Sequence, residues 1–128
     1  MKKSFPTDQE FDRLISRAMN ELPRRDIENL NNVVVTYADE PDQHQAGKIQ
    51  LRGDSLLLGL YEGIPLTKRG MGYNLVLPDK ITLFKIPLVK YARFRGSEVY
   101  EEIKHTLWHE IAHFYGLDHS DINLIDKV

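Results

Sequence analysis

The stretch HEIAHFYGLDH, residues 109–119, constrains the fold of this chain more than any other part of the sequence. Read as a helix, it places His109 and His113 one turn apart on one face, where two imidazoles can bind the same ion. Gly116 is expected to end this helix, because glycine adopts the left-handed conformation that turns a chain away from a helix end. The chain can then turn back and present His119 as a third ligand.

Glu110 is expected to have a different role from the histidines. It lies about 100° around the helix from His109, a poor position for a third ligand and a good one for taking a proton from a water on the metal. Three histidine ligands leave a fourth position open, which is the layout of a catalytic zinc site. The chain has no cysteine, so nitrogen and oxygen must hold the metal. Neutral imidazole suits zinc best, although iron, cobalt and nickel also accept it.

The composition excludes several other classes of protein. With 128 residues, a single domain over residues 1–128 is expected, and 41% hydrophobic with 28% charged residues argues against disorder. The net charge of −2 gives no strong attraction to nucleic acid or to an anionic membrane, and neither partner is expected. No apolar run approaches the roughly 18 residues of a membrane span. The N-terminus lacks the apolar run of a signal peptide, and without cysteines a cytoplasmic location is expected.

The first thirty residues predict helical structure. Thr7 and Glu10 have the spacing of a capping box, and apolar residues then recur at helical spacing. We expect a helix from Asp8 to Glu21, which ends before Pro23. A short further turn of helix is expected over Ile27–Leu30.

Three apolar runs predict the strands of a small sheet. Val33–Tyr37 is β-branched and indicates a strand buried on both faces, and Leu56–Tyr61 indicates a second strand. Ile81–Ile86 indicates a third, at an edge, because prolines bracket it and Lys85 lies within it. An exposed edge beside a metal site can pair with an extended peptide as one more strand. We therefore expect an α+β fold, in which a short mixed or antiparallel sheet of three or four strands packs against the N-terminal helix and the long motif helix.

The segments between the strands are expected to be loops and links. Asp39–Gly47 is polar, and His44 within it is expected to be solvated and not a ligand. Lys68–Tyr73 is basic and rich in glycine, and two interpretations stay open for it: a solvated turn, or a flap over a cleft. Leu88–Phe94 is expected to form a short helical or irregular link, closed by Gly96.

The main helix is expected to begin after Ser97, a good N-cap residue. Its apolar residues fall in one stripe nearly opposite the two motif histidines, so one face can pack on the sheet while the other lines a cleft. His105 is offset too far to join His113 on one ion easily and is expected at the surface or just behind the ligands. The stripe consists of Tyr100, Ile103, Leu107, Ile111 and Phe114.

The motif resembles that of the zincin metallopeptidases, and His119 matches the extended metzincin spacing. Upstream, GLYEGIPLTKRG followed by LPDKITLFKIPL is similar to the minimal-zincin family, a group of small bacterial metallopeptidase-like proteins. The resemblance covers roughly Leu58–Asp121. It implies a small zincin-like fold, zinc ligands at His109 and His113, Glu110 as general base and a third ligand at position 119. An acidic residue often stands there in that family, which leaves Asp118 as an alternative to His119.

Three functions stay open at this point. The first is a zinc-dependent metallopeptidase-like hydrolase acting on an unidentified peptide or protein, although no methionine follows His119 to form the turn of the metzincins. The second is a non-catalytic metal-binding interaction module, which has no need of a general base. The third is a zinc-dependent endoribonuclease of ribosome maturation, a family whose histidine spacing also fits but which usually lacks glutamate at position 110. Donors considered for the transition state are Tyr61, Arg69, Tyr73 and Tyr91.

Overall fold

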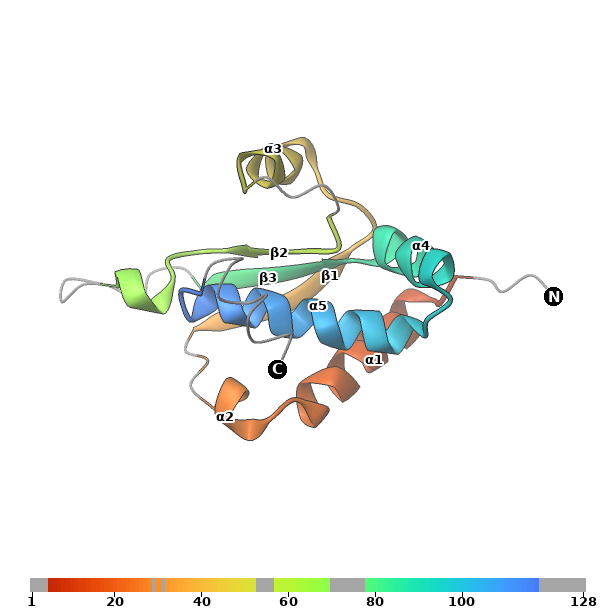
Figure 1. The fold of residues 1–128 in the computed structure, drawn as a ribbon, viewed down its shortest axis with the longest axis horizontal. Coiled ribbons are helices and arrows are strands. Elements are labelled where there is room, and N and C mark those ends of the chain that lie inside the picture. The colour runs from red at the N-terminus through yellow and green to blue at the C-terminus, as the bar shows by residue number, and fades with distance from the viewer. Residues whose placement is uncertain (1–4, 29, 31, 53–56, 70–77, 118–128) are drawn as a thin grey trace.

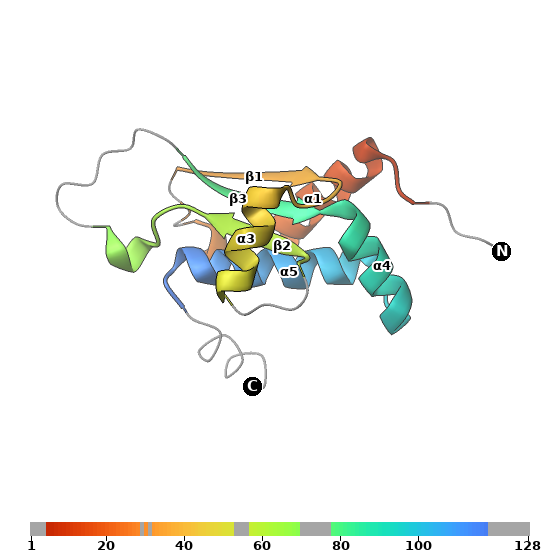
Figure 2. The ribbon, with the colours of Figure 1, turned by 90° about the horizontal axis from the view of Figure 1, so that it is seen from above.

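The computed structural model describes residues 5–28, 30, 32–52, 57–69 and 78–117. The elements are α1 (Asp8–Glu21), α2 (Arg24–Ile27), β1 (Val33–Ala38), α3 (Gln43–Arg52), β2 (Gly59–Glu62), the 3-10 turn η1 (Leu66–Lys68), β3 (Asp79–Phe84), α4 (Lys85–Arg95) and α5 (Val99–Phe114). Helices α1 and α5 lie on one side of the sheet and α3 lies on the other (Figure 1). In the view from above, α3 lies in front of the sheet (Figure 2). The α+β class predicted from the sequence is confirmed.

The sheet has the strand order β1-β3-β2, with β1 parallel and β2 antiparallel to β3. The prediction that Ile81–Ile86 is an edge strand is wrong, because β3 is central and nearly all its side chains are buried. Lys85 lies outside the strand: it begins α4, and its amine donates to Asp8 Oδ1 at 3.0 Å. Pro87 falls in the first turn of α4, where a proline sacrifices no helical hydrogen bond. Among the strands of the described residues, β1 and β2 are therefore the edges of the sheet.

Strand β1 is found where the β-branched run predicted it, but its predicted burial on both faces is wrong. It is an edge strand in which Val34 is 46% exposed and the other side chains are half-buried. Its register with β3 pairs Val33 with Asp79. An apolar run of this length fits an edge strand as well as a central one. Which of the two it forms depends on whether it pairs with one neighbouring strand or with two. The second predicted strand appears as β2, which begins at Gly59 and not at Leu56, a residue outside the described part.

Helix α1 has the predicted bounds and the predicted capping box. The Glu10 N–H donates to Thr7 Oγ1 at 3.1 Å, and the Thr7 N–H donates to Glu10 Oε1 at 2.9 Å. The next helix, α2, begins one turn earlier than the predicted Ile27–Leu30, directly after Pro23, whose fixed φ suits the start of a helix.

The segment Asp39–Gly47 was predicted to be a loop, and this is wrong, because α3 begins within it. The Gln45 N–H donates to Asp42 Oδ1 at 2.7 Å, and the Asp42 N–H donates to Gln45 Oε1 at 3.1 Å. These reciprocal bonds form a capping box built from Asp and Gln, which explains why a polar stretch starts a helix here. His44 lies on α3 and is exposed.

The link over Leu88–Phe94 is helical and lies within α4. Gly96, with φ 69°, ends this helix, and the Ser97 N–H then donates to Ala92 O at 2.9 Å. Ser97 thus completes the end of α4, and the prediction that it caps α5 is wrong. The N-cap position of α5 is held by Glu98, without a side-chain capping bond.

The apolar stripe predicted for α5 is buried along its whole length and packs with α1 and the sheet. The main core cluster combines the stripe from Tyr100 to Ile111 with α1 residues such as Phe11 and Ile15 and with the β3 residues Ile81 and Leu83. Burial of this face leaves the motif histidines on another side of the helix. In the described part of the chain, no helix has the length and apolar character needed to cross a membrane.

Candidate metal centre

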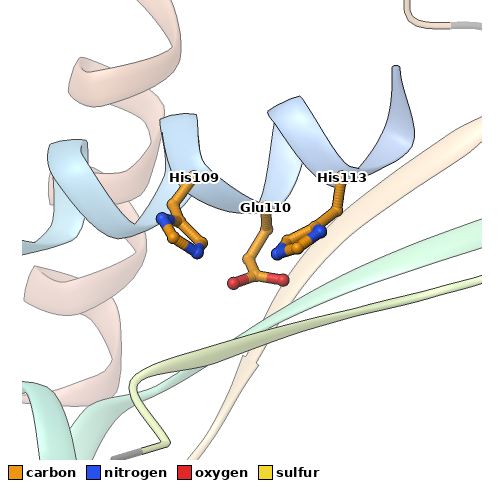
Figure 3. Close-up of side chains that lie close together, drawn as sticks. All are labelled: His109, Glu110 and His113. Carbon is orange, nitrogen blue, oxygen red and sulfur yellow. The ribbon is translucent and has the colours of Figure 1, made fainter. Parts of the chain in front are cut away.

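Three side chains from the last two turns of α5 lie close together: His109, Glu110 and His113 (Figure 3). One ligand atom of each, an imidazole nitrogen or a carboxylate oxygen, lies within 4.8 Å of the others. The two imidazole centroids are 5.1 Å apart, with an angle of 67° between the rings. The spacing of four residues therefore places both histidines on one helix face, as the sequence predicted.

The glutamate of this group is more deeply buried than the two histidines. The two histidines are half-buried, whereas Glu110 is only 3% exposed. Glu110 Oε1 accepts a hydrogen bond of 2.9 Å from the Tyr61 N–H in β2. The carboxylate lies between the two imidazoles and points toward this strand (Figure 3). Glu110 is thus fixed by an element distant in sequence, while the histidines stay accessible.

The close approach of α5 to β2 depends on Gly59. A Cβ at this position would lie 2.8 Å from the methyl group of Thr106, which is too close for carbon atoms. Thr106 precedes Glu110 by four residues on the same helix face, so the contact with Gly59 brings Glu110 within reach of Tyr61. A side chain at Gly59 would push the helix away from the strand.

Gly116 ends the motif helix as predicted, with φ 89° and its N–H bonded to His113 O at 2.9 Å. A Cβ at Gly116 would also overlap the side chain of Thr67 in η1. This position therefore requires glycine for both its backbone conformation and its packing. His119 and Asp118 lie outside the described residues, so the third ligand stays a prediction.

A buried charged network is bonded to the side chain of Tyr61, the residue whose N–H binds Glu110. Arg69 Nη2 lies 2.5 Å from Asp79 Oδ2, and the two side chains are 7% and 4% exposed. The Tyr61 hydroxyl donates to the same carboxylate oxygen. Burial, and then the neighbouring Asp79 carboxylate, raise the pKa of the Tyr61 hydroxyl above its ordinary value. Sequence analysis did not single out Asp79; the available signal was an acidic residue that follows Pro78 at the start of a strand.

The structure describes three of the four proposed transition-state donors, and the polar groups of each are bonded to residues other than the two histidines. The Tyr61 hydroxyl and the Arg69 guanidinium both bind Asp79. Tyr91 lies on α4, and its hydroxyl accepts a hydrogen bond from Arg95 Nη1 at 3.1 Å. Helix α4 itself lies near the N-terminal end of α5, whereas the histidines lie near its C-terminal end (Figure 1). Tyr73 lies outside the described residues. His105 is exposed and does not belong to the metal-binding group that the described residues form.

Comparison with known proteins agrees with this geometry. A family model described as "Zincin-like metallopeptidase" matches residues 30–128, a span that includes the whole sheet, α5 and the histidine motif. The chain belongs to the zincin-like metallopeptidase family. The match begins after α1 and α2, so these two helices lie outside it. No match was found among curated proteins.

The residues of the site fit the zinc ion that this family implies. The two imidazoles are donors that zinc accepts, the Glu110 carboxylate lies close enough to face a water on such an ion, and the chain has no thiolate that would form a closed structural site. The half-burial of both histidines leaves a path for a ligand to enter.

Proposed function

We propose that this protein is a zinc-dependent peptidase in which His109, His113 and His119 bind one zinc ion and Glu110 is the general base. The observation that carries the proposal is the placement of the Glu110 carboxylate, buried between two accessible imidazoles. A protein that only binds metal has no need for a buried carboxylate at this position, since burying one costs free energy. The buried glutamate therefore supports catalysis over a purely binding role.

The chemistry is hydrolysis of a peptide bond. A zinc ion bound here lowers the pKa of a coordinated water toward ~7 and polarises the scissile carbonyl. Glu110 accepts the proton of the attacking water and later delivers it to the leaving amine. The Tyr61 N–H holds one oxygen of Glu110, which limits rotation of the carboxylate beside the reacting groups.

The substrate we propose is an extended peptide that lies along β2. The sequence had indicated Ile81–Ile86 as the exposed edge, but that segment forms the central strand β3. Strand β2 is the sheet edge next to Glu110, because the Tyr61 N–H points away from β3 and toward the carboxylate. In an antiparallel pair the N–H and C=O of one residue point the same way, so the Tyr61 carbonyl also faces this side. Because the Tyr61 N–H is bound to Glu110, we propose that the peptide donates a backbone hydrogen bond to the Tyr61 carbonyl on this edge.

The family match and the glutamate both favour peptide over RNA as substrate. The endoribonucleases with this histidine spacing usually lack a glutamate at the position of Glu110, and the match here is to a peptidase-like family. The net charge of −2 adds no attraction to RNA.

The test is Glu110→Gln, which keeps an oxygen acceptor for the Tyr61 N–H and removes the base. Peptide-library cleavage, followed by mass spectrometry, should fall by about 10²–10⁴-fold with the zinc content unchanged. Glu101→Gln, an exposed glutamate on the same helix, is the matched control and should cleave at the wild-type rate. Undiminished cleavage by the Glu110 variant, or cleavage of structured RNA in place of peptide, would contradict the proposal.

A further inference from the structure

We propose that Tyr61 is a positioning residue for Glu110, and that the buried Arg69–Asp79 pair acts through it. Tyr61 touches the general base with its backbone and the ion pair with its side chain. The catalytic consequence rests on the proposed function, whereas the positioning itself can be measured in the absence of any substrate.

Tyr61 is fixed at three points. Its N–H donates to Glu110 Oε1 at 2.9 Å, and its hydroxyl donates to Asp79 Oδ2. Its ring packs edge-on against Phe114, with centroids 6.1 Å apart and an angle of 85° between the planes. Phe114 follows Glu110 by one helical turn, so this ring contact holds the same part of α5 against the strand. Together these contacts fix the strand backbone at the residue that binds the base.

The ion pair is itself held in place from several sides. Arg69 Nε donates to the Ile64 carbonyl at 2.9 Å, and its guanidinium lies 5.0 Å from the centre of the Phe114 ring. The Asp79 N–H donates to the Asn32 carbonyl at 2.8 Å. The network therefore joins three segments around the Tyr61 hydroxyl: Asn32 before β1, Asp79 at the start of β3, and Ile64 and Arg69 after β2.

Gly63 makes room for this arrangement. A Cβ at Gly63 would overlap the Asp79 carboxylate, so the chain that leaves β2 can pass over Asp79 only with glycine at this position. Buried ion pairs are a poor source of net stability, because desolvation of the charges offsets much of their attraction. A network bonded to the hydroxyl of the residue that holds Glu110 is therefore better explained by the position that it gives Tyr61.

The positioning limits the freedom of Glu110. A glutamate side chain has several rotatable bonds, and a carboxylate that accepts no fixed donor samples many orientations. With Oε1 bound to the strand, the plane of the carboxylate stays beside both imidazoles (Figure 3). Loss of the Tyr61 hydroxyl should slow the chemical step more than it weakens substrate binding, because the base would be present and less often in position.

The experiment compares Tyr61→Phe with Tyr115→Phe in the full chain. Tyr115 packs edge-on against the same Phe114 ring at 5.2 Å, but its hydroxyl donates to the Asp26 carbonyl, away from Glu110. In Tyr61→Phe the amide at position 61 should exchange its hydrogen about tenfold faster by NMR, with zinc content unchanged. On a cleaved peptide, kcat should fall by about tenfold and KM should stay within about twofold. Tyr115→Phe should change none of these quantities.

A third variant separates this proposal from the proposed function. Glu110→Ala removes the acceptor and should speed exchange of the Tyr61 amide by at least about tenfold, whether or not the protein cleaves peptides. Unchanged exchange of this amide in Glu110→Ala, or in Tyr61→Phe, would overturn the positioning role. Equal effects of Tyr61→Phe and Tyr115→Phe would also overturn it, because they would show a general loosening around Phe114. Absence of cleavage by the wild type would count against the proposed function alone.

Discussion

Two glutamates, Glu10 in α1 and Glu110 in α5, each accept a backbone N–H at 2.9 Å, and they serve opposite purposes. Glu10 is exposed and bonds to Thr7, three residues away, where it completes a helix cap. Glu110 is buried and bonds to Tyr61, 49 residues away in sequence. The same type of hydrogen bond therefore caps a helix at Glu10 and holds the carboxylate beside the two histidines at Glu110. The two glutamates differ in the sequence distance to their donor residue and in their exposure to solvent, and substitutions around each can test whether these differences matter.

Replacing one buried phenylalanine in each helix by alanine should lower the unfolding free energy in both cases but disturb the metal site in only one. Phe11 in α1 and Phe114 in α5 are both fully buried, so each change to alanine should cost about 3–5 kcal/mol of unfolding free energy. Only Phe114→Ala should also weaken zinc binding and speed exchange of the Tyr61 amide, because Phe114 directly follows His113 on α5 and its ring packs against Tyr61. Urea unfolding and zinc titration measure the two effects. Equal weakening of zinc binding in both variants would contradict the distinction.

The sequence was sufficient to predict α1, its cap, the apolar stripe of α5 and the glycine that ends it. Each depends on residues within about one or two helical turns, where side-chain spacing decides the structure. The pairing of His109 with His113 belongs to the same class, because a helix alone brings them together.

The errors concern partners that are distant in sequence. The prolines on both sides of Ile81–Ile86 and Lys85 within it predicted an edge strand, whereas Lys85 begins α4 and its amine donates to Asp8, 77 residues away in sequence. The bond from Tyr61 to Glu110 and the pairing of Arg69 with Asp79 depend on which strand lies beside α5. Strand order is set by packing of the whole sheet, and no local pattern encodes it.

Glycine substitutions should show which backbone positions the site requires. Gly116→Ala should destabilise the protein by about 1–3 kcal/mol, because it forces alanine to φ 89° and onto Thr67. Gly47→Ala is the matched control, since it lies in α3 with open space around its Cβ and should stabilise by about 0.4–1 kcal/mol. Chemical denaturation gives both values, and similar effects of the two changes would refute the special role of Gly116.

The local cap should affect stability without affecting the site. Thr7→Ala removes the acceptor for the Glu10 N–H and should cost about 1 kcal/mol in urea unfolding. Zinc content and amide exchange at Tyr61 should be the same as in the wild type. A loss of zinc in this variant would show that α1 supports the site more directly than its contacts indicate.

The smallest expected effect is a dependence of stability on acidic pH. The backbone bond from Thr7 lowers the pKa of Glu10, and the Tyr100 hydroxyl, followed by Arg17, lowers that of Glu21, both from 4.5. Because the folded-state pKa values lie below the unfolded ones, this stabilisation is present above about pH 4.5 and is lost as the pH falls through the folded values. The difference in unfolding free energy between wild type and Glu21→Gln should therefore shrink in acid. A difference that stayed constant from pH 6 to pH 3 would contradict this.

The most direct test of the metal site is the zinc content of protein purified without added metal, measured by elemental analysis. The account predicts about one zinc ion per chain in the wild type and in His105→Ala, and very little in His113→Ala. His119→Ala in the same series reports on the third ligand, which we expect also to lose zinc. Wild-type protein without zinc, or His113→Ala with its full complement, would contradict the assignment of this helix as a metal centre.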